Sequence, residues 1–221
     1  MRIGIAGFAG SGKDTVGKFL QQILLEKGVD LAIQKFASPL KEITAKVFGE
    51  NFDERDTKEK EVDFLQDKKE KVYSEVSVFL DSLDISSEDK DNFIGYMFDN
   101  LLQFADKCSP RKFQQVLGGA GRFIDEDFWV KSQKDKSGIF TDVRFENEAD
   151  AMDRLIYVFR PCIDIQYFDK YLKGELDKSE HFAANIENYT KINVGCIYNQ
   201  SSLEVLQKNC LYYIENYLNI N

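Results

Sequence analysis

The amino-acid sequence predicts an α/β fold in which helices flank a five-stranded, mostly parallel sheet. Three observations lead to this prediction. Short apolar runs without polar alternation recur along the chain, and such runs are typical of strands buried on both faces. Segments with apolar residues three and four positions apart lie between them, as crossover helices require. A glycine-rich turn directly follows the first apolar run, at the kind of position where open α/β sheets bind ligands.

The first elements alternate between strand and helix. Residues 3–6 predict a buried strand, and residues 14–28 predict a helix that ends at a glycine suited to its C-terminus. Residues 31–36 predict the second strand. Pro39 is well placed as the first residue of the next helix, because proline is favoured there.

Residues 50–107 interrupt this alternation and are expected to be an acidic insertion. The stretch opens with a densely charged run, which is typical of a solvated helical face. Two helices are predicted within it, at 72–83 and 89–107, before Pro110 opens another. We therefore expect residues 37–135 to form a helical region within a single domain of 221 residues.

The α/β alternation resumes after Gly138. The predicted elements are a strand at 139–143, a short helix at 146–154, a strand at 155–159, a strand at 192–197 and a final helix at 202–218. Residues 161–188 show no clean period. Strands that alternate with helices imply right-handed crossovers and ligands at the carboxyl ends of the strands.

The composition excludes several classes of protein. With 43% hydrophobic and 13% aromatic residues, the chain is too apolar to be disordered. Its 29 Lys and Arg against 38 Asp and Glu give a formal charge of -9, so it lacks the general basic field that nonspecific nucleic-acid binding needs. No apolar run is long enough to predict a membrane span. An anionic ligand must therefore be held by a local cluster of cations.

The cysteines indicate a reducing compartment. The 4 cysteines form no CxxC pair, and the single histidine, His181, cannot complete a Cys/His zinc site of familiar spacing. We expect a reduced protein located in the cytoplasm. For a viral protein this would be the cytoplasm of the host cell.

The glycine-rich turn at 7–13 fits the pattern GxxxxGK between a predicted strand and a predicted helix. Glycines let the backbone N–H groups turn towards phosphates, the helix N-terminus adds positive potential, and Lys13 reaches the outer phosphates. If Lys13 were merely exposed to solvent, its position would be unexplained, because the N-terminus of a helix disfavours a cation unless an anion lies beside it. The predicted nucleotide contacts are Gly10, Ser11, Gly12, Lys13, Asp14 and Thr15.

The residue after the lysine is Asp14, and the hydroxyl comes one position later, at Thr15. In this respect the turn, GSGKDT, resembles the GSGKGT of adenylate kinase and related nucleoside monophosphate kinases. That resemblance implies that Thr15 contacts the α-phosphate and that Mg²⁺ is held largely through water. Asp14 would hold one of these waters, or would simply stabilise the first helical turn.

Charged residues near predicted element ends form a second group of candidates. The arginines concerned are Arg111, Arg122, Arg144 and Arg160, which would either grip phosphate oxygens or form surface ion pairs. Asp142 ends a predicted strand, where it would order the water shell of Mg²⁺ or cap the following helix. The predicted catalytic set is Lys13, Asp142, Arg144 and Arg160, with Asp14 and Asp142 as the candidate metal-associated carboxylates.

Several blocks spread over nearly the whole chain resemble the deoxynucleoside monophosphate kinases of bacteriophages. They are GSGKDTV ending at Val16, FASPLKE at 36–42, SPRKFQQVLG at 109–118 with Arg122, FWV at 128–130, TDVRFENEAD at 141–150 and FRP at 159–161. The resemblance implies a P-loop kinase three-layer fold and transfer of the ATP γ-phosphate to a deoxynucleoside monophosphate. ATP and Mg²⁺ are the implied cofactors.

The resemblance also implies residue roles. Lys13 and the loop amides would bind ATP, while Arg144 and Arg160 would contact the transferring phosphate. The implied acceptor contacts are Lys41, Arg111, Gln115, Arg122 and Trp129. The chain departs from the family in having LGGA at 117–120 and Asp177 where a histidine is usual. These departures concern the substrate rather than the phosphate chemistry.

Two further segments acquire roles by this resemblance. Residues 161–188, with their lysines, would form a lid that closes and excludes water. Residues 198–201 would pack against adenine. A surface loop is the alternative for the first segment.

Other functions compete with this one. A P-loop kinase of another phosphorylated small molecule, such as phosphomevalonate or dephospho-coenzyme A, shares the phosphate loop. A nucleotide-binding regulatory protein without turnover is the alternative from another class. Base preference, sugar preference, the role of the insertion and the oligomeric state, a homodimer included, stay open.

Overall fold

In the computed structural model, which describes residues 1–53, 57–102 and 106–218, the chain forms two compact units. The sheet unit comprises Met1–Phe36 and Lys134–Asn221, and the helical unit comprises Ala37–Gln133. The helical unit is thus inserted into the sheet unit in sequence. Its bounds nearly coincide with the helical region expected at 37–135.

The sheet unit is built on five parallel strands. They are β1 (Arg2–Ala6), β2 (Ile33–Gln34), β5 (Gly138–Phe140), β6 (Arg154–Phe159) and β7 (Val194–Tyr198). The strand order is β2-β5-β1-β6-β7, and every pairing is parallel. The predicted five-stranded α/β sheet is confirmed, with β1 at its centre.

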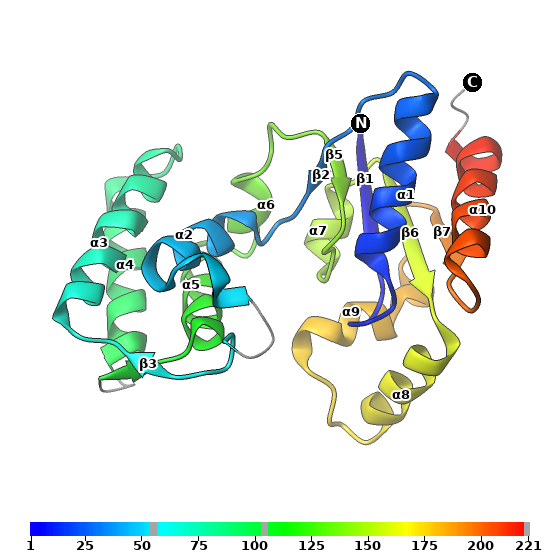
Figure 1. Cartoon of the computed structure of the whole chain (residues 1–221). Coiled ribbons are helices and arrows are strands. Elements are labelled where there is room, and N and C mark those ends of the chain that lie inside the picture. Colours follow the sequence, from blue (N-terminus) through cyan, green and yellow to red (C-terminus); the bar gives the residue numbers. More distant parts are fainter. Residues whose placement is uncertain (54–56, 103–105, 219–221) are drawn as a thin grey trace. The chain divides into compact units, whose positions relative to one another are not determined.

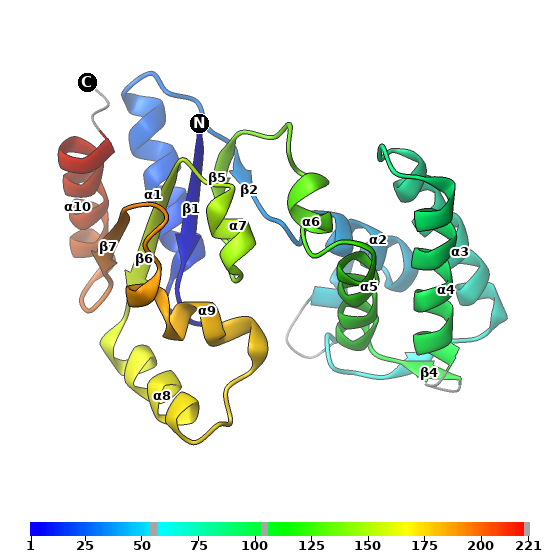
Figure 2. The same cartoon turned by 180° about the vertical axis from the view of Figure 1, so that it is seen from behind.

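Helices cover both faces of this sheet. Figures 1 and 2 show α1 (Lys13–Glu26) and α10 (Leu203–Tyr213) on one face and α7 (Glu146–Asp150) on the other. Val16 and Leu20 of α1 are fully buried in a core that also contains Ile5 of β1. Burial of each such side chain contributes about 1.5–3 kcal/mol. The 3.6-residue period that predicted α1 therefore corresponds to the face that covers the sheet.

The segment expected to lack regular structure begins with a helix. Residues 161–188 contain α8 (Pro161–Leu172) and α9 (His181–Ala184), with 3-10 turns at Lys178–Glu180 and Ile186–Asn188. Figure 1 shows α8 and α9 near the ends at which β1 and β6 finish. The period was not visible in the sequence because large apolar side chains of α8, such as Ile165 and Leu172, are exposed.

The helical unit contains five helices and a short antiparallel ribbon among its described residues. They are α2 (Ser38–Phe48), α3 (Gln66–Asp81), α4 (Ser87–Leu102), α5 (Pro110–Ile124) and α6 (Phe128–Lys131), with β3 (Val62–Asp63) paired to β4 (Lys107–Cys108) and a 3-10 turn at Glu50–Asp53. The prediction of a helix at 89–107 is wrong at its C-terminal end, because Lys107 lies in the strand β4. Residues 103–105, which belong to the same prediction, lie outside the described residues.

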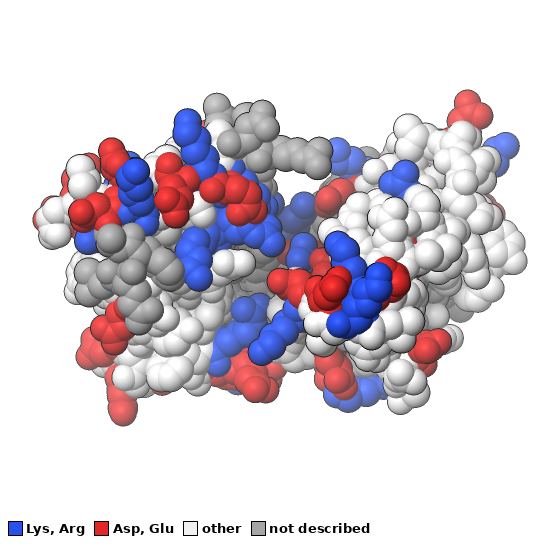
Figure 3. Space-filling view, turned by 90° about the horizontal axis from the view of Figure 1, so that it is seen from below, with Lys and Arg blue, Asp and Glu red and all other residues white. Residues whose placement is uncertain are grey.

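The acidic insertion supplies much of the core of the helical unit. Phe64, Val76, Phe93 and Met97 are each at most 1% exposed and belong to one apolar cluster. Acidic and basic side chains are interspersed on the surface of this unit in Figure 3. The charged sequence pattern thus corresponds to amphipathic helices whose apolar faces pack together.

Candidate phosphate-binding site

The glycine-rich loop joins the end of β1 to the start of α1, as its sequence predicts. Gly7, Gly10 and Gly12 have φ angles of 143°, 83° and 99°, which side chains disfavour. A Cβ on Gly7 would lie 2.8 Å from the carbonyl oxygen of Val158, so this backbone also packs closely on β6. The glycines are therefore required by the loop conformation and by its contact with the sheet.

Asn199 fixes the loop from the carboxyl end of β7. Its side-chain Nδ2 donates to the carbonyl of Ser11 at 2.7 Å, and its backbone N–H donates to the carbonyl of Phe159 at 2.8 Å. Asn199 therefore connects the loop to the ends of two strands. Sequence reasoning placed residues 198–201 near adenine and missed this positioning role.

Lys13 begins α1, and its ammonium group lies within the loop. Nζ donates to the carbonyls of Gly7 at 2.5 Å and Phe8 at 2.9 Å. Burial lowers the pKa of Lys13 to about 8, although nearby carboxylates, Glu180 foremost, act to raise it. The loop and the first turn of α1 thus hold a partly desolvated cation where the sequence predicted a phosphate ligand.

The carboxylates predicted to order Mg²⁺ join elements of the sheet unit. Asp14 Oδ1 accepts from Thr141 Oγ1 at 3.0 Å and pairs with Lys35 Nζ at 2.7 Å. Partial burial acts to raise the pKa of Asp14, but Lys35 and Thr141 outweigh it and hold that pKa below its usual value. Asp142 Oδ1 accepts from the backbone N–H of Phe36 at 2.9 Å, just beyond β2.

These carboxylates do not form a closed metal site. Among the described residues, no group of three or more His, Cys, Asp or Glu side chains is placed to hold a metal ion. The side chain of Asp14 is 66% exposed, and Thr15 follows it on the first turn of α1. This donor set fits a Mg²⁺ ion that is bound mainly by phosphates and water, because Mg²⁺ usually keeps several of its waters.

Arg160 contacts the loop from the end of β6. Its guanidinium donates to the carbonyl of Gly10 at 2.9 Å, and its backbone N–H donates to Asp164 Oδ2 at 2.8 Å. Asp164 is 1% exposed and also accepts from the hydroxyl of Tyr157 at 2.5 Å. Burial raises the pKa of Asp164 against the opposing effect of these hydrogen bonds. The sequence did not identify Asp164, since an acidic residue in a first helical turn is ordinary.

The helix α8 packs on the loop through aromatic side chains. Phe8 is fully buried and stacks on Tyr167 with ring centroids 4.7 Å apart, while Phe168 meets it edge-on at 5.8 Å. Gly10 faces Ile163 on the same helix. The first part of the predicted lid therefore packs against the glycine-rich loop through a small apolar contact.

Arg144 lies between β5 and α7 and reaches the turn before α9. Its NH1 donates to Ser179 Oγ at 3.4 Å and lies 3.6 Å from Glu180 Oε1. Its backbone N–H donates to Glu148 Oε2 at 2.7 Å, which fixes the start of α7. The positive charge of Arg144 also acts to lower the pKa of Lys13. The structure thus brings Lys13, Arg144 and Arg160 to one end of the sheet.

The candidate acceptor residues belong to the helical unit and have local partners. Arg111 and Gln115 line a cavity of about 320 Å³ together with Glu59 and Glu61. Arg111 Nε lies 3.3 Å from Glu59 Oε1. Two acidic side chains therefore share this cavity with the predicted phosphate ligand. Lys41 lies half-buried on α2.

Trp129 and Arg122 both contact the carbonyl of Gly118. The indole Nε1 of Trp129 donates to it at 3.0 Å, and Arg122 NH1 donates to it at 3.2 Å. Trp129 is 4% exposed and stacks on Phe79 with ring centroids 5.8 Å apart. These contacts give Trp129 a structural role in the core of the helical unit, whereas Arg122 is exposed at the end of α5.

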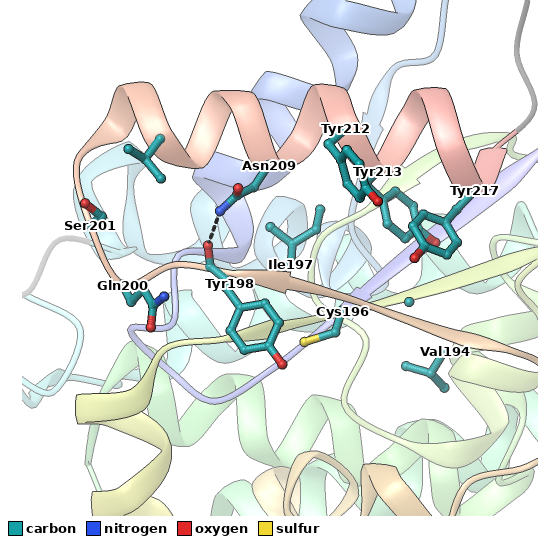
Figure 4. A pocket seen from close by; sticks show the side chains of 12 residues that line it. Val194, Cys196, Ile197, Tyr198, Gln200, Ser201, Asn209, Tyr212, Tyr213 and Tyr217 are labelled. Atoms are coloured by element: carbon teal, nitrogen blue, oxygen red, sulfur yellow. Dashed lines mark hydrogen bonds between the residues drawn. The ribbon is translucent and has the colours of Figure 1, made fainter.

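A cavity of about 750 Å³ lies along β7 and α10 (Figure 4). Among the described residues, its lining has no charged side chain and includes Tyr198, Tyr212 and Tyr217, each more than half exposed. Asn209 Nδ2 donates to the carbonyl of Tyr198 at 2.9 Å and connects the helix to the strand. Gln200 and Ser201 of the predicted adenine segment lie at one end of this cavity.

The comparisons with known proteins name no relative for this site: no family model matches the sequence, and no curated protein matches it significantly. In the described ranges, no helix is both long and apolar enough to span a membrane. All 4 cysteines have free thiols, two of them buried.

Proposed function

We propose that the chain is a P-loop kinase that transfers the γ-phosphate of ATP to a deoxynucleoside monophosphate, giving a deoxynucleoside diphosphate and ADP. The observation that carries this proposal is the glycine loop with Lys13 inside it and Arg160 donating to it, together with Arg144, whose charge acts on the pKa of Lys13. Phosphoryl transfer needs such a convergence of cations around a loop of backbone N–H groups.

The fold supports the same proposal. Numbered by appearance in the chain, the parallel strands of the sheet run 2-3-1-4-5, so the loop follows the central strand. This position suits the three-layer fold of P-loop kinases, with ligands at the carboxyl ends of the strands. The helical unit would supply the acceptor site, and residues 161–188 would act as the lid. A cytoplasmic location, without nucleic-acid or membrane partners, is part of this proposal.

The donor triphosphate would bind to the loop and to the N-terminus of α1. Backbone N–H groups from Gly10 to Thr15 would donate to its oxygens, and the helix dipole would favour its charge. Lys13 would exchange its carbonyl partners, Gly7 and Phe8, for the outer phosphates. The loop binds and orients the donor without any covalent step.

Transfer would then depend on position and charge. Arg144 and Arg160 would neutralise charge on the transferring phosphoryl group, and their planar guanidinium groups suit bidentate binding of its oxygens. The acceptor phosphate oxygen is already anionic, so no strong general base is needed. Mg²⁺, when bound to the phosphates, supplies further charge neutralisation, and Asp14 would hold one of its waters.

The acceptor would be bound by exposed polar residues of the helical unit. Arg111 and Arg122 would hold its phosphate, with Lys41 and Gln115 beside them, as the resemblance implies. For Arg111 this requires exchange of Glu59 for phosphate. Closure of the lid would exclude water that could otherwise hydrolyse ATP.

A coupled ADP-release assay with ATP, Mg²⁺ and a panel of acceptors tests this proposal. We expect ADP release that depends on one or more deoxynucleoside monophosphates. Release that depends on phosphomevalonate or dephospho-coenzyme A would move the function to another P-loop kinase. ATP binding without ADP release with any acceptor would support a regulatory nucleotide-binding protein instead.

A further inference from the structure

Glu180 is a buried carboxylate next to the proposed phosphate site. It is 7% exposed and ends the 3-10 turn Lys178–Glu180. Its Oε1 lies 3.6 Å from the guanidinium of Arg144, and its negative charge acts to raise the pKa of Lys13. A buried carboxylate is stable only with compensating partners, and here both cations are proposed phosphate ligands.

The turn that carries Glu180 also directs Arg144. The guanidinium donates to Ser179 Oγ at 3.4 Å. The same hydroxyl donates to Asp177 Oδ1 at 2.6 Å, and that carboxylate also accepts the backbone N–H of Ser179 at 2.9 Å. Asp177 thus fixes Ser179, and Ser179 together with Glu180 fixes the guanidinium of Arg144.

We propose that Glu180 is an internal counter-ion of the phosphate site, which positions Arg144 and competes with bound phosphate for the charge of Arg144 and Lys13. This inference rests on the phosphate-binding part of the proposed function. A phosphate group that reaches these cations meets a carboxylate of the same sign. Glu180 therefore weakens the binding of polyphosphate, which favours release of product, and it acts chiefly through Arg144 as a positioning residue.

The binding of inorganic tripolyphosphate, measured by calorimetry without any acceptor, tests this proposal. Glu180→Gln keeps the size of the side chain and removes its charge. We expect the variant to bind tripolyphosphate about tenfold more tightly than the wild type, the scale of one charge a few ångströms away. Glu175→Gln is the matched control, since it removes an exposed charge from the same segment and should change the affinity by less than twofold. If Glu180 had a purely structural role, Glu180→Gln would weaken the binding of tripolyphosphate instead.

The dependence on Arg144 is tested by the same substitution in an Arg144→Ala background. Residues that act together give a non-additive cycle. We expect the gain from Glu180→Gln to shrink to about threefold or less in that background, with Lys13 accounting for what is left. Equal gains in the two backgrounds would overturn the action through Arg144. Unchanged or weaker binding by Glu180→Gln would overturn the whole inference.

Circular dichroism shows whether the variants fold. If Glu180→Gln does not fold, Glu180→Asp withdraws the carboxylate from Arg144 and should tighten binding by a smaller factor; no gain would overturn the proposal. A wild-type protein that does not bind tripolyphosphate would contradict the proposed phosphate site and this inference together. A wild-type protein that binds it but phosphorylates no acceptor would contradict the proposed kinase reaction alone.

Discussion

The candidate residues of the sheet unit and those of the helical unit differ in how they are held. In the sheet unit, Arg160 donates to a carbonyl of the glycine-rich loop, and Arg144 pairs with Glu180, whose charge also acts to raise the pKa of Lys13. In the helical unit, Arg111 pairs with Glu59, and Trp129 is enclosed by aromatic side chains. The first group is connected around one loop, whereas the members of the second have separate partners. A shared network is the stronger indication of a common ligand.

The largest effect should come from the centre of the connected group. Lys13→Ala is expected to lower kcat with ATP and the best acceptor at least about 100-fold. The substitution removes a cation that would stabilise the negative charge developing on the phosphates in the transition state. Lys18→Ala, an exposed position on the same helix, is the control. Thermal unfolding should show a folded protein in both cases. Normal turnover by a folded Lys13→Ala variant would contradict the proposed role of the loop in phosphoryl transfer.

Arg144 and Arg111 compare the two units directly. Arg144→Ala should lower kcat by about 10- to 100-fold with little change in the KM of the acceptor, since it contacts charge that develops in the transition state. Arg111→Ala should mainly raise the KM of the acceptor, because it would bind the ground state and the transition state alike. Steady-state kinetics separate the two.

Arg154→Ala, an exposed arginine of the sheet unit, is the control for both variants. Similar small effects from all three substitutions would reduce Arg144 and Arg111 to surface charges, whose ion pairs contribute only about 0–1 kcal/mol.

Asn199 tests how far the loop depends on its neighbours. Asn199→Ala removes the bond to the Ser11 carbonyl and should lower the free energy of unfolding by about 1–3 kcal/mol. It should also raise the KM of ATP several-fold, because the loop loses its attachment to β7. Asn100→Ala removes a similar bond to the Tyr96 carbonyl in α4 and should leave the KM of ATP unchanged. Equal KM values for both variants would show that Asn199 does not position the loop.

The sequence predicted the parts of the molecule that follow from local rules. The strand, glycine loop and helix from Arg2 to Glu26 are coded by neighbouring residues, so their geometry could be predicted. The helix α8 was missed because its apolar residues do not follow one buried face. Asp164 and Asn199 were missed as supports because their partners depend on the folded sheet. Trp129, implied only by resemblance, lies in a core whose packing no local pattern encodes.

Trp129 gives the smallest expected kinetic effect. Trp129→Phe keeps the aromatic packing and loses the hydrogen bond to the Gly118 carbonyl, so it should lower the unfolding free energy by about 1–3 kcal/mol. At equal amounts of folded protein, the KM of the acceptor should stay within about twofold of the wild type. A raised KM of the acceptor with an unchanged melting temperature would contradict this expectation and support the predicted contact between Trp129 and the acceptor.

The most direct test of the central claim is to follow the γ-phosphate itself. ATP labelled in this phosphate is incubated with Mg²⁺, the wild-type protein and each deoxynucleoside monophosphate, and the products are separated. The proposed kinase transfers the label to a deoxynucleoside diphosphate, and Lys13→Ala does not. Label that appears only as inorganic phosphate, or that stays in ATP with every acceptor, would contradict the proposed reaction.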